Sequence, residues 1–77
     1  MNLPLALTLM RVAEGSTQED LAKALNVSKS HICEIEKGKK MPSLDLIESY
    51  AQHFQIQVSA VFRFAERLEA NHLCFLE

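Results

Sequence analysis

Two short helices joined by one tight turn are predicted within residues 17–38, and this arrangement constrains the fold more than any other part of the chain. In the first half, Leu21, Ala22 and Leu25 recur at helical spacing, so one apolar stripe faces inward. Asn26 follows, and asparagine tolerates the left-handed conformation in which many helices end. The chain is therefore expected to reverse direction directly after the first short helix.

Polar side chains mark where each of the two helices begins. Thr17 is placed to cap the first helix, with Asp20 three residues later as a shorter form of the capping box, and Ser28 is placed to cap the second. Ile32 and Ile35 are the inward positions of the second helix. The opposite side of that helix carries Lys29, Ser30, Cys33 and Glu34. A packed helix with a small polar face of this kind fits the major groove of DNA.

Three further helices are predicted, which makes the fold all-α. Pro4 suits the first turn of a helix that runs to about Glu14, and the leucines of this helix cover more than one face. A fourth helix follows the cap at Ser43 and ends around Gln55, and a fifth begins near Ser59. The fourth helix has its inward positions at Leu44, Ile47, Tyr50, Ala51 and Phe54. The fifth has them at Val61, Phe62, Ala65 and Leu68.

Three stretches of the sequence, TQEDLAKALNVS, IEKGKKMPSL and SLDLIESYAQHFQIQVSAVF, resemble the lambda-repressor-like (Cro/CI-type) helix-turn-helix family. The resemblance covers roughly residues 3–62. It implies one five-helix DNA-binding domain over residues 1–77, with the helix-turn-helix at 17–36 and a fifth helix and short C-terminal extension at 59–77. The sequence departs from the family at Ser16, where relatives usually carry an apolar residue, and at Asn26 and Gln55, where they often carry glycine.

The resemblance also implies roles for individual residues. Base contacts are expected from the third helix, where Lys29 is suited to donate to guanine, Glu34 to accept from cytosine, and Ser30 to do either, with Cys33 as a small contact residue. Phosphate contacts are expected from Gln18, Ser28, His31, Lys37, Lys39 and Lys40. In relatives, the positions of Arg11 and Glu36 form a structural salt bridge, so neither residue is expected to touch DNA.

The distribution of charge agrees with a DNA-binding face better than the total charge does. The formal net charge is -2, yet five of the eight basic residues lie between positions 23 and 40. The rival hypothesis is a protein-interaction or adaptor module that keeps the fold without sequence-specific DNA binding. Salt-dependent binding to random duplex DNA separates the two. The sequence shows no arrangement of catalytic residues and no small-molecule motif, so an enzyme is not expected.

Histidine and cysteine occur together twice, at His31 and Cys33 and again at His72 and Cys74. Residues two apart on a helix do not face each other, so no metal site and no cofactor are expected. A redox role for Cys33 requires an exposed, acidified thiol. The two cysteines make no disulfide framework, and no signal peptide or membrane span is expected, which indicates a cytoplasmic protein.

A homodimer is predicted from the apolar residues beyond the shared fold, because they exceed what one short terminal segment usually buries. The expected interface residues are Phe64, Leu68, Leu73, Phe75 and Leu76. Leu5 and Leu9 of the first helix also need a cover. The alternative is that this segment folds back on its own first helix. The apolar run after Asn71 is too short to decide between helix and strand.

Overall fold

The computed structural model describes the backbone of residues 1–76 and the side chains of residues 1–68. Its elements in chain order are the helices α1 (Leu3–Glu14), α2 (Gln18–Leu25), α3 (Lys29–Glu36), α4 (Leu44–His53) and α5 (Val58–Leu76). The predicted all-α, five-helix class is confirmed, and no strand occurs within the described residues. The sequence left helix and strand open after Asn71, and in the structure this stretch is helical, since α5 continues to Leu76.

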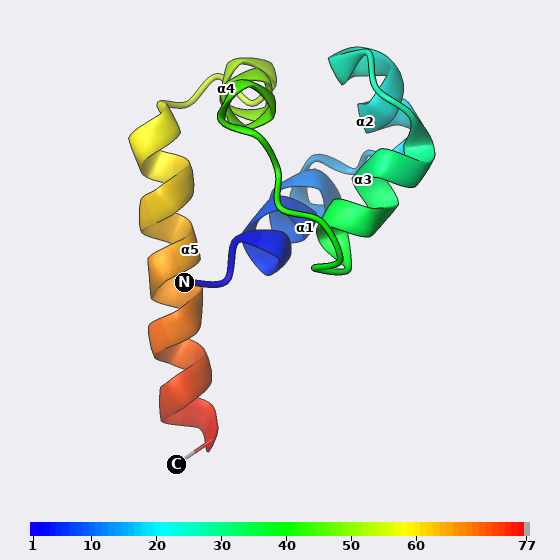
Figure 1. Ribbon diagram of the computed structural model, residues 1–77. Helices are drawn as coiled ribbons and strands as arrows, with labels where there is room; N and C mark the ends of the chain where they lie inside the picture. The colour runs from blue at the N-terminus through cyan, green and yellow to red at the C-terminus, as the bar shows by residue number, and fades with distance from the viewer. Residues whose placement is uncertain (77) are drawn as a thin grey trace.

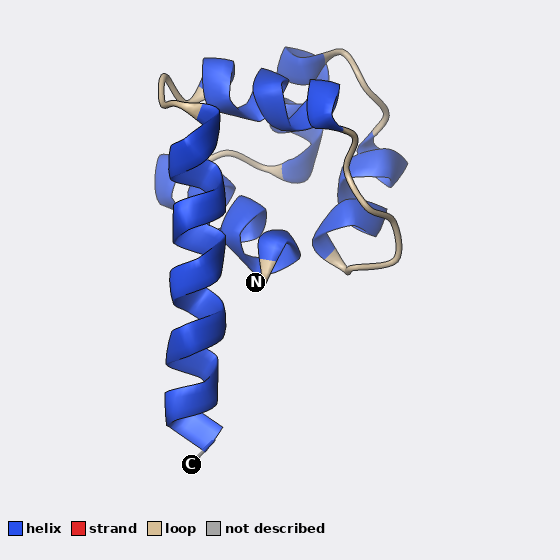
Figure 2. Ribbon diagram, turned by 60° about the vertical axis from the view of Figure 1, so that its left-hand side comes forward, coloured by secondary structure: helices blue, strands red, loops and turns tan. Residues whose placement is uncertain are grey.

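Helix α1 lies in the middle of the molecule and touches both α3 and α5 (Figure 1). Helices α2 and α3 pack together on one side of α1, and α4 bridges between α2 and α5. Coloured by secondary structure, the molecule shows helices joined by short loops, and the C-terminal half of α5 runs past the N-terminus (Figure 2). No helix in the described part of the chain has the length and apolar character needed to cross a membrane.

One hydrophobic core joins all five helices. Its buried members are Leu3, Ala6, Leu7, Leu21, Ala22, Ile32, Ile35, Leu46, Ile47, Tyr50, Ala51, Val61 and Ala65. The inward positions predicted for α2, α3 and α5 lie in this core or pack against it. One inward position of α4 was wrong, because Leu44 is exposed and Leu46 is buried in its place. Leu46 shares a face with Tyr50 four residues later, so it continues the buried stripe to the start of the helix.

The helix ends follow the local signals of the sequence. Thr17 and Asp20 form the capping box at the start of α2, and the side chains of Ser28 and Ser43 cap α3 and α4. Asn26 closes α2 in the left-handed conformation, with φ of 58°. Gln55, after α4, has the same φ of 58°. Glutamine lacks the short side chain that makes this conformation tolerable for asparagine, so the backbone at Gln55 is strained.

A largely buried ion pair ties α1 to the end of α3. Arg11 Nε donates to Glu36 Oε2 at 2.8 Å and Arg11 Nη2 donates to Glu36 Oε1 at 3.0 Å. The side chains are only 14% and 5% exposed. Arg11 also donates from Nη1 to the Ser16 carbonyl at 2.7 Å, and Gln18 Nε2 donates to Glu36 Oε1 at 2.9 Å. The hydrogen bond to Glu36 raises the pKa of Arg11 above its ordinary value.

Replacing Glu36 by alanine should destabilise the fold by about 3 kcal/mol or more, because it leaves the largely buried guanidinium of Arg11 without its charged partner. Chemical denaturation monitored by circular dichroism measures this change. The matched control is Glu19→Ala, since Glu19 is exposed and its pair with Lys23 spans 3.8 Å, so its loss should cost less than about 1 kcal/mol. An equal loss of unfolding free energy in the two variants would mean that the Arg11–Glu36 pair stabilises the fold no more than an exposed ion pair does.

Replacing Gln55 by glycine should raise the free energy of unfolding by up to about 1 kcal/mol, since relief of left-handed strain exceeds the entropy that glycine adds to the unfolded chain. Thermal melting of Gln55→Gly and of Asn26→Gly checks this. The gain at Asn26 should be smaller, because asparagine already tolerates a positive φ. A lower melting temperature for Gln55→Gly than for the wild type would contradict the strain.

Candidate nucleic-acid interface

The orientation of α3 is set by what it buries. Ile32 and Ile35 are fully buried, and Leu21 and Ala22 of α2 join them in the core. An α-helix advances about 100° per residue, so burying these two isoleucines turns positions 29, 30, 33 and 34 outward. The turn between the helices is held by backbone bonds, with the Val27 amide donating to the Ala22 carbonyl at 2.9 Å. The outward face of α3 is therefore fixed by the core.

The four residues expected to contact bases line one hollow on this outward face: Lys29, Ser30, Cys33 and Glu34. Lys29 and Ser30 are exposed, whereas Cys33 and Glu34 are partly exposed. Cys33 is a free thiol. The hollow offers an ammonium, a hydroxyl, a thiol and a carboxylate side by side, which is a set able to donate and accept hydrogen bonds at the edge of a base pair.

A second hollow shares Lys29 with the first and extends to the start of α2, where Gln18 lines it. Gln18 was expected to hold a phosphate, and in the structure one of its amide hydrogens is used on Glu36 Oε1 at 2.9 Å. An amide group has a second hydrogen to donate. Ser28 accepts from the His31 amide at 3.1 Å, which leaves its hydroxyl proton available. Both side chains lie at helix N-termini, where the backbone favours anions.

The other residues expected at phosphates divide into two groups. Lys37, Lys39 and Lys40 are exposed at the end of α3 and in the following loop. His31 is half-buried and does not line the hollow on the outward face of α3. Of these four residues, Lys40 places its ammonium near the carboxylate of a hollow residue, Glu34.

Two polar contacts of the site were not anticipated from the sequence. Lys40 Nζ lies 3.6 Å from Glu34 Oε1, and Gln18 bonds to Glu36 as described above. Opposite charges six residues apart across a helix end give no periodic signal, so the first contact needed the path of the loop. The second joins two residues 18 positions apart. Glu36 thus holds both Arg11 and a residue of the candidate interface.

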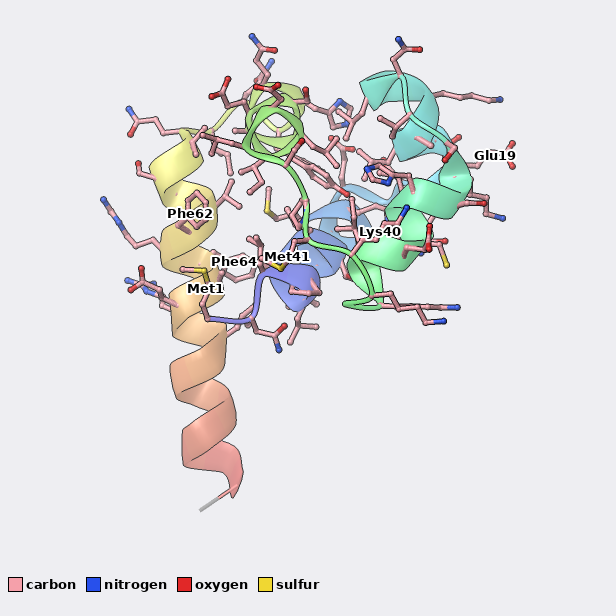
Figure 3. The ribbon with its side chains drawn as sticks, viewed as in Figure 1. Met1, Glu19, Lys40, Met41, Phe62 and Phe64 are labelled. Atoms are coloured by element: carbon pink, nitrogen blue, oxygen red, sulfur yellow. The ribbon has the colours of Figure 1, made fainter. Side chains whose placement is uncertain are left out.

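The residues expected at the dimer interface are described only in part. Phe64 and Leu68 are partly buried against the core, and Phe64 lies on the side of α5 that faces α1 (Figure 3). The Asn2 amide donates to the Ala65 carbonyl at 3.0 Å, so the described part of α5 packs along α1. This is the contact that the fold-back alternative expects. Leu73, Phe75 and Leu76 lie outside the residues whose side chains are described.

No three histidine, cysteine, aspartate or glutamate side chains gather into a potential metal site among the residues described. His31 and Cys33 belong to this part of the chain. The second pair, His72 and Cys74, lies outside the residues whose side chains are described.

Comparison with known proteins places this geometry in a family. The profile of the helix-turn-helix family matches residues 7–61. An HTH-type transcriptional regulator of Methanocaldococcus jannaschii is 43% identical over 56 residues, which are 73% of this chain and 85% of the relative. The competence pilus inhibition repressor of Acinetobacter baylyi is 33% identical over 69 residues, which are 90% of this chain and 63% of the relative.

The solved structures agree with the sequence comparison. The crystal structure of the clp gene regulator ClgR from Corynebacterium glutamicum superimposes with a TM-score of 0.86 at 30% identity, over 94% of this chain and 77% of that one. The predicted resemblance is thereby confirmed. The chain belongs to the Cro/CI-type helix-turn-helix family and is a transcriptional regulator with a helix-turn-helix DNA-binding domain.

Proposed function

We propose that the protein is a sequence-specific repressor or autoregulator that binds a palindromic operator as a homodimer and reads it with α3. The observation that carries this proposal is the hollow formed by Lys29, Ser30, Cys33 and Glu34 on the outward face of α3. The core fixes that face, so its four polar groups keep a set spacing when the helix enters a major groove.

Each hollow residue has a role that its chemistry supports. Lys29 donates to guanine O6 and N7, a pair of adjacent acceptors that only guanine presents in the major groove. Glu34 accepts from cytosine N4, and the Ser30 hydroxyl donates or accepts. Cys33 contributes a small, weakly polar surface that lets the helix approach the bases closely. Sequence preference is thus expected from one donor and one acceptor on the same face.

Phosphates hold the protein in register on the duplex. Gln18 and Ser28 offer their remaining hydrogens next to the N-terminal amides of α2 and α3, where a phosphate is favoured. Lys37 and Lys39 add exposed positive charge beside the end of α3. Each lysine that neutralises a phosphate releases condensed counterions, so binding must weaken as salt is raised.

A homodimer is part of the proposal because one helix-turn-helix unit reads only a few base pairs. Two-fold pairing sets two reading helices one helical turn apart, about 34 Å, and joins two weak contacts into one site. Apolar surface is available for such an interface. Leu5, Leu9 and Val12 are exposed along one stripe of α1, and Phe64 and Leu68 of the neighbouring α5 are only partly covered.

The rival function, an adaptor module without sequence-specific DNA binding, draws its support from the acidic total charge of -2. A titration with random duplex DNA at two salt concentrations separates the two functions. The regulator should bind and lose affinity steeply as salt rises. Absence of binding to random duplex DNA at low salt would favour the adaptor function.

The reading face is tested by Lys29→Ala, which should cost about 1 to 3 kcal/mol on the preferred duplex and relax the preference at one symmetric base pair. Selection from a random duplex pool followed by titration measures both effects. Lys39→Ala is the control, since it should weaken all duplexes alike and flatten the salt slope by about 1. An unchanged base preference for Lys29→Ala would remove Lys29 from the reading residues.

The dimer is tested by sedimentation at micromolar concentration. We expect a dimer for the full chain, because the partly covered apolar residues of α1 and α5 gain a cover by association. A chain shortened to residue 71 locates the interface. A dimer that survives the deletion would lie on α5 before residue 72, and a monomeric full chain would refute the interface altogether.

A further inference from the structure

The loop after α3 folds back over the end of that helix. The Gly38 amide donates to the Ile35 carbonyl at 3.0 Å, and the chain turns there with φ of 78° at Gly38. The amides of Lys39 and Lys40 then both donate to the Glu34 carbonyl, at 2.9 and 3.4 Å. Glu34 therefore anchors the start of the loop through its own backbone.

The same turn brings the side chains of Glu34 and Lys40 together, and Lys40 lies beside α3 (Figure 3). Lys40 Nζ lies 3.6 Å from Glu34 Oε1, with the two side chains 56% and 41% exposed. Glu34 is the one carboxylate of the hollow on the outward face. Lys37 and Lys39 make no ion pair among the described residues, so Lys40 differs from its neighbours in having a partner.

An isolated carboxylate on this face opposes DNA binding, because it is repelled by the phosphates. A lysine beside it offsets that repulsion and also limits the positions that the carboxylate adopts. The pair is weak while water surrounds it. It strengthens when the duplex excludes water and lowers the local dielectric constant.

We propose that Lys40 is a positioning residue for sequence reading: it holds the Glu34 carboxylate toward a base pair whose cytosine presents its N4 amino group. Glutamate accepts a hydrogen bond from this donor, and guanine O6 or thymine O4 at that position would face it with an acceptor. Lys40 thus acts on base preference through Glu34, whereas Lys39 acts on phosphates alone. The inference rests on the proposed reading of DNA by α3.

A double-mutant cycle with base selection tests this role. Wild type, Lys40→Ala, Glu34→Ala and the double variant are each used to select from a random duplex pool, and then titrated with the duplex that the wild type prefers. Lys40→Ala should lose the preference for cytosine at one symmetric position, as Glu34→Ala does. Lys40→Ala should lower the affinity by a factor at least about three times larger when Glu34 is present than when position 34 is alanine.

Two further variants act as controls. Lys39→Ala removes the same charge one residue away, and it should lower affinity by the same factor with and without Glu34 and leave base preference unchanged. Lys40→Arg keeps the charge and should keep the preference for cytosine. All the substituted residues are at least partly exposed, and unchanged melting temperatures would show that the fold is retained.

The outcomes separate the inference from the function on which it rests. A wild type that selects a sequence, together with Lys40→Ala that keeps the same preference, overturns the positioning role alone. Equal losses of affinity for Lys40→Ala in both backgrounds do the same. A wild type that selects no sequence overturns both the positioning role and the proposed function.

Discussion

The position of α3 depends on the largely buried ion pair between Arg11 and Glu36. Glu36 closes α3 and accepts from Arg11 of α1 through both carboxylate oxygens, and it also accepts from Gln18 at the start of α2. Arg11 in turn donates to the Ser16 carbonyl in the turn between α1 and α2. Three helices and one turn therefore meet at one charge pair, which fixes their relative placement by directed bonds rather than by shape alone.

The fold was largely predictable because its signals are local. Each capping serine or threonine lies directly before the helix that it caps, and Asn26 adopts the left-handed conformation that its side chain favours. Burial was less predictable at the helix ends. Leu44 has the spacing of an inward residue, yet it is exposed and Leu46 is buried. Periodicity identifies a stripe, and the neighbouring helices decide where the stripe stops.

The candidate site was likewise predictable in part. Helical spacing placed Lys29, Ser30, Cys33 and Glu34 on one face, and the structure brings these four residues to one hollow. The contact between Lys40 and Glu34 was not predictable, because it depends on the turn at Gly38 and on two amides that bond to one carbonyl. Contacts across a loop depend on the path of the backbone, which no periodic pattern encodes.

Helices α2 and α3 have eight residues each, which is shorter than a helix needs to be stable alone in water. Packing into the core that all five helices share keeps these two helices folded. A peptide cut from residues 17–38 would therefore be largely unfolded and would bind DNA only through its charge. The outward face of α3 and the fold should therefore be lost in one thermal transition.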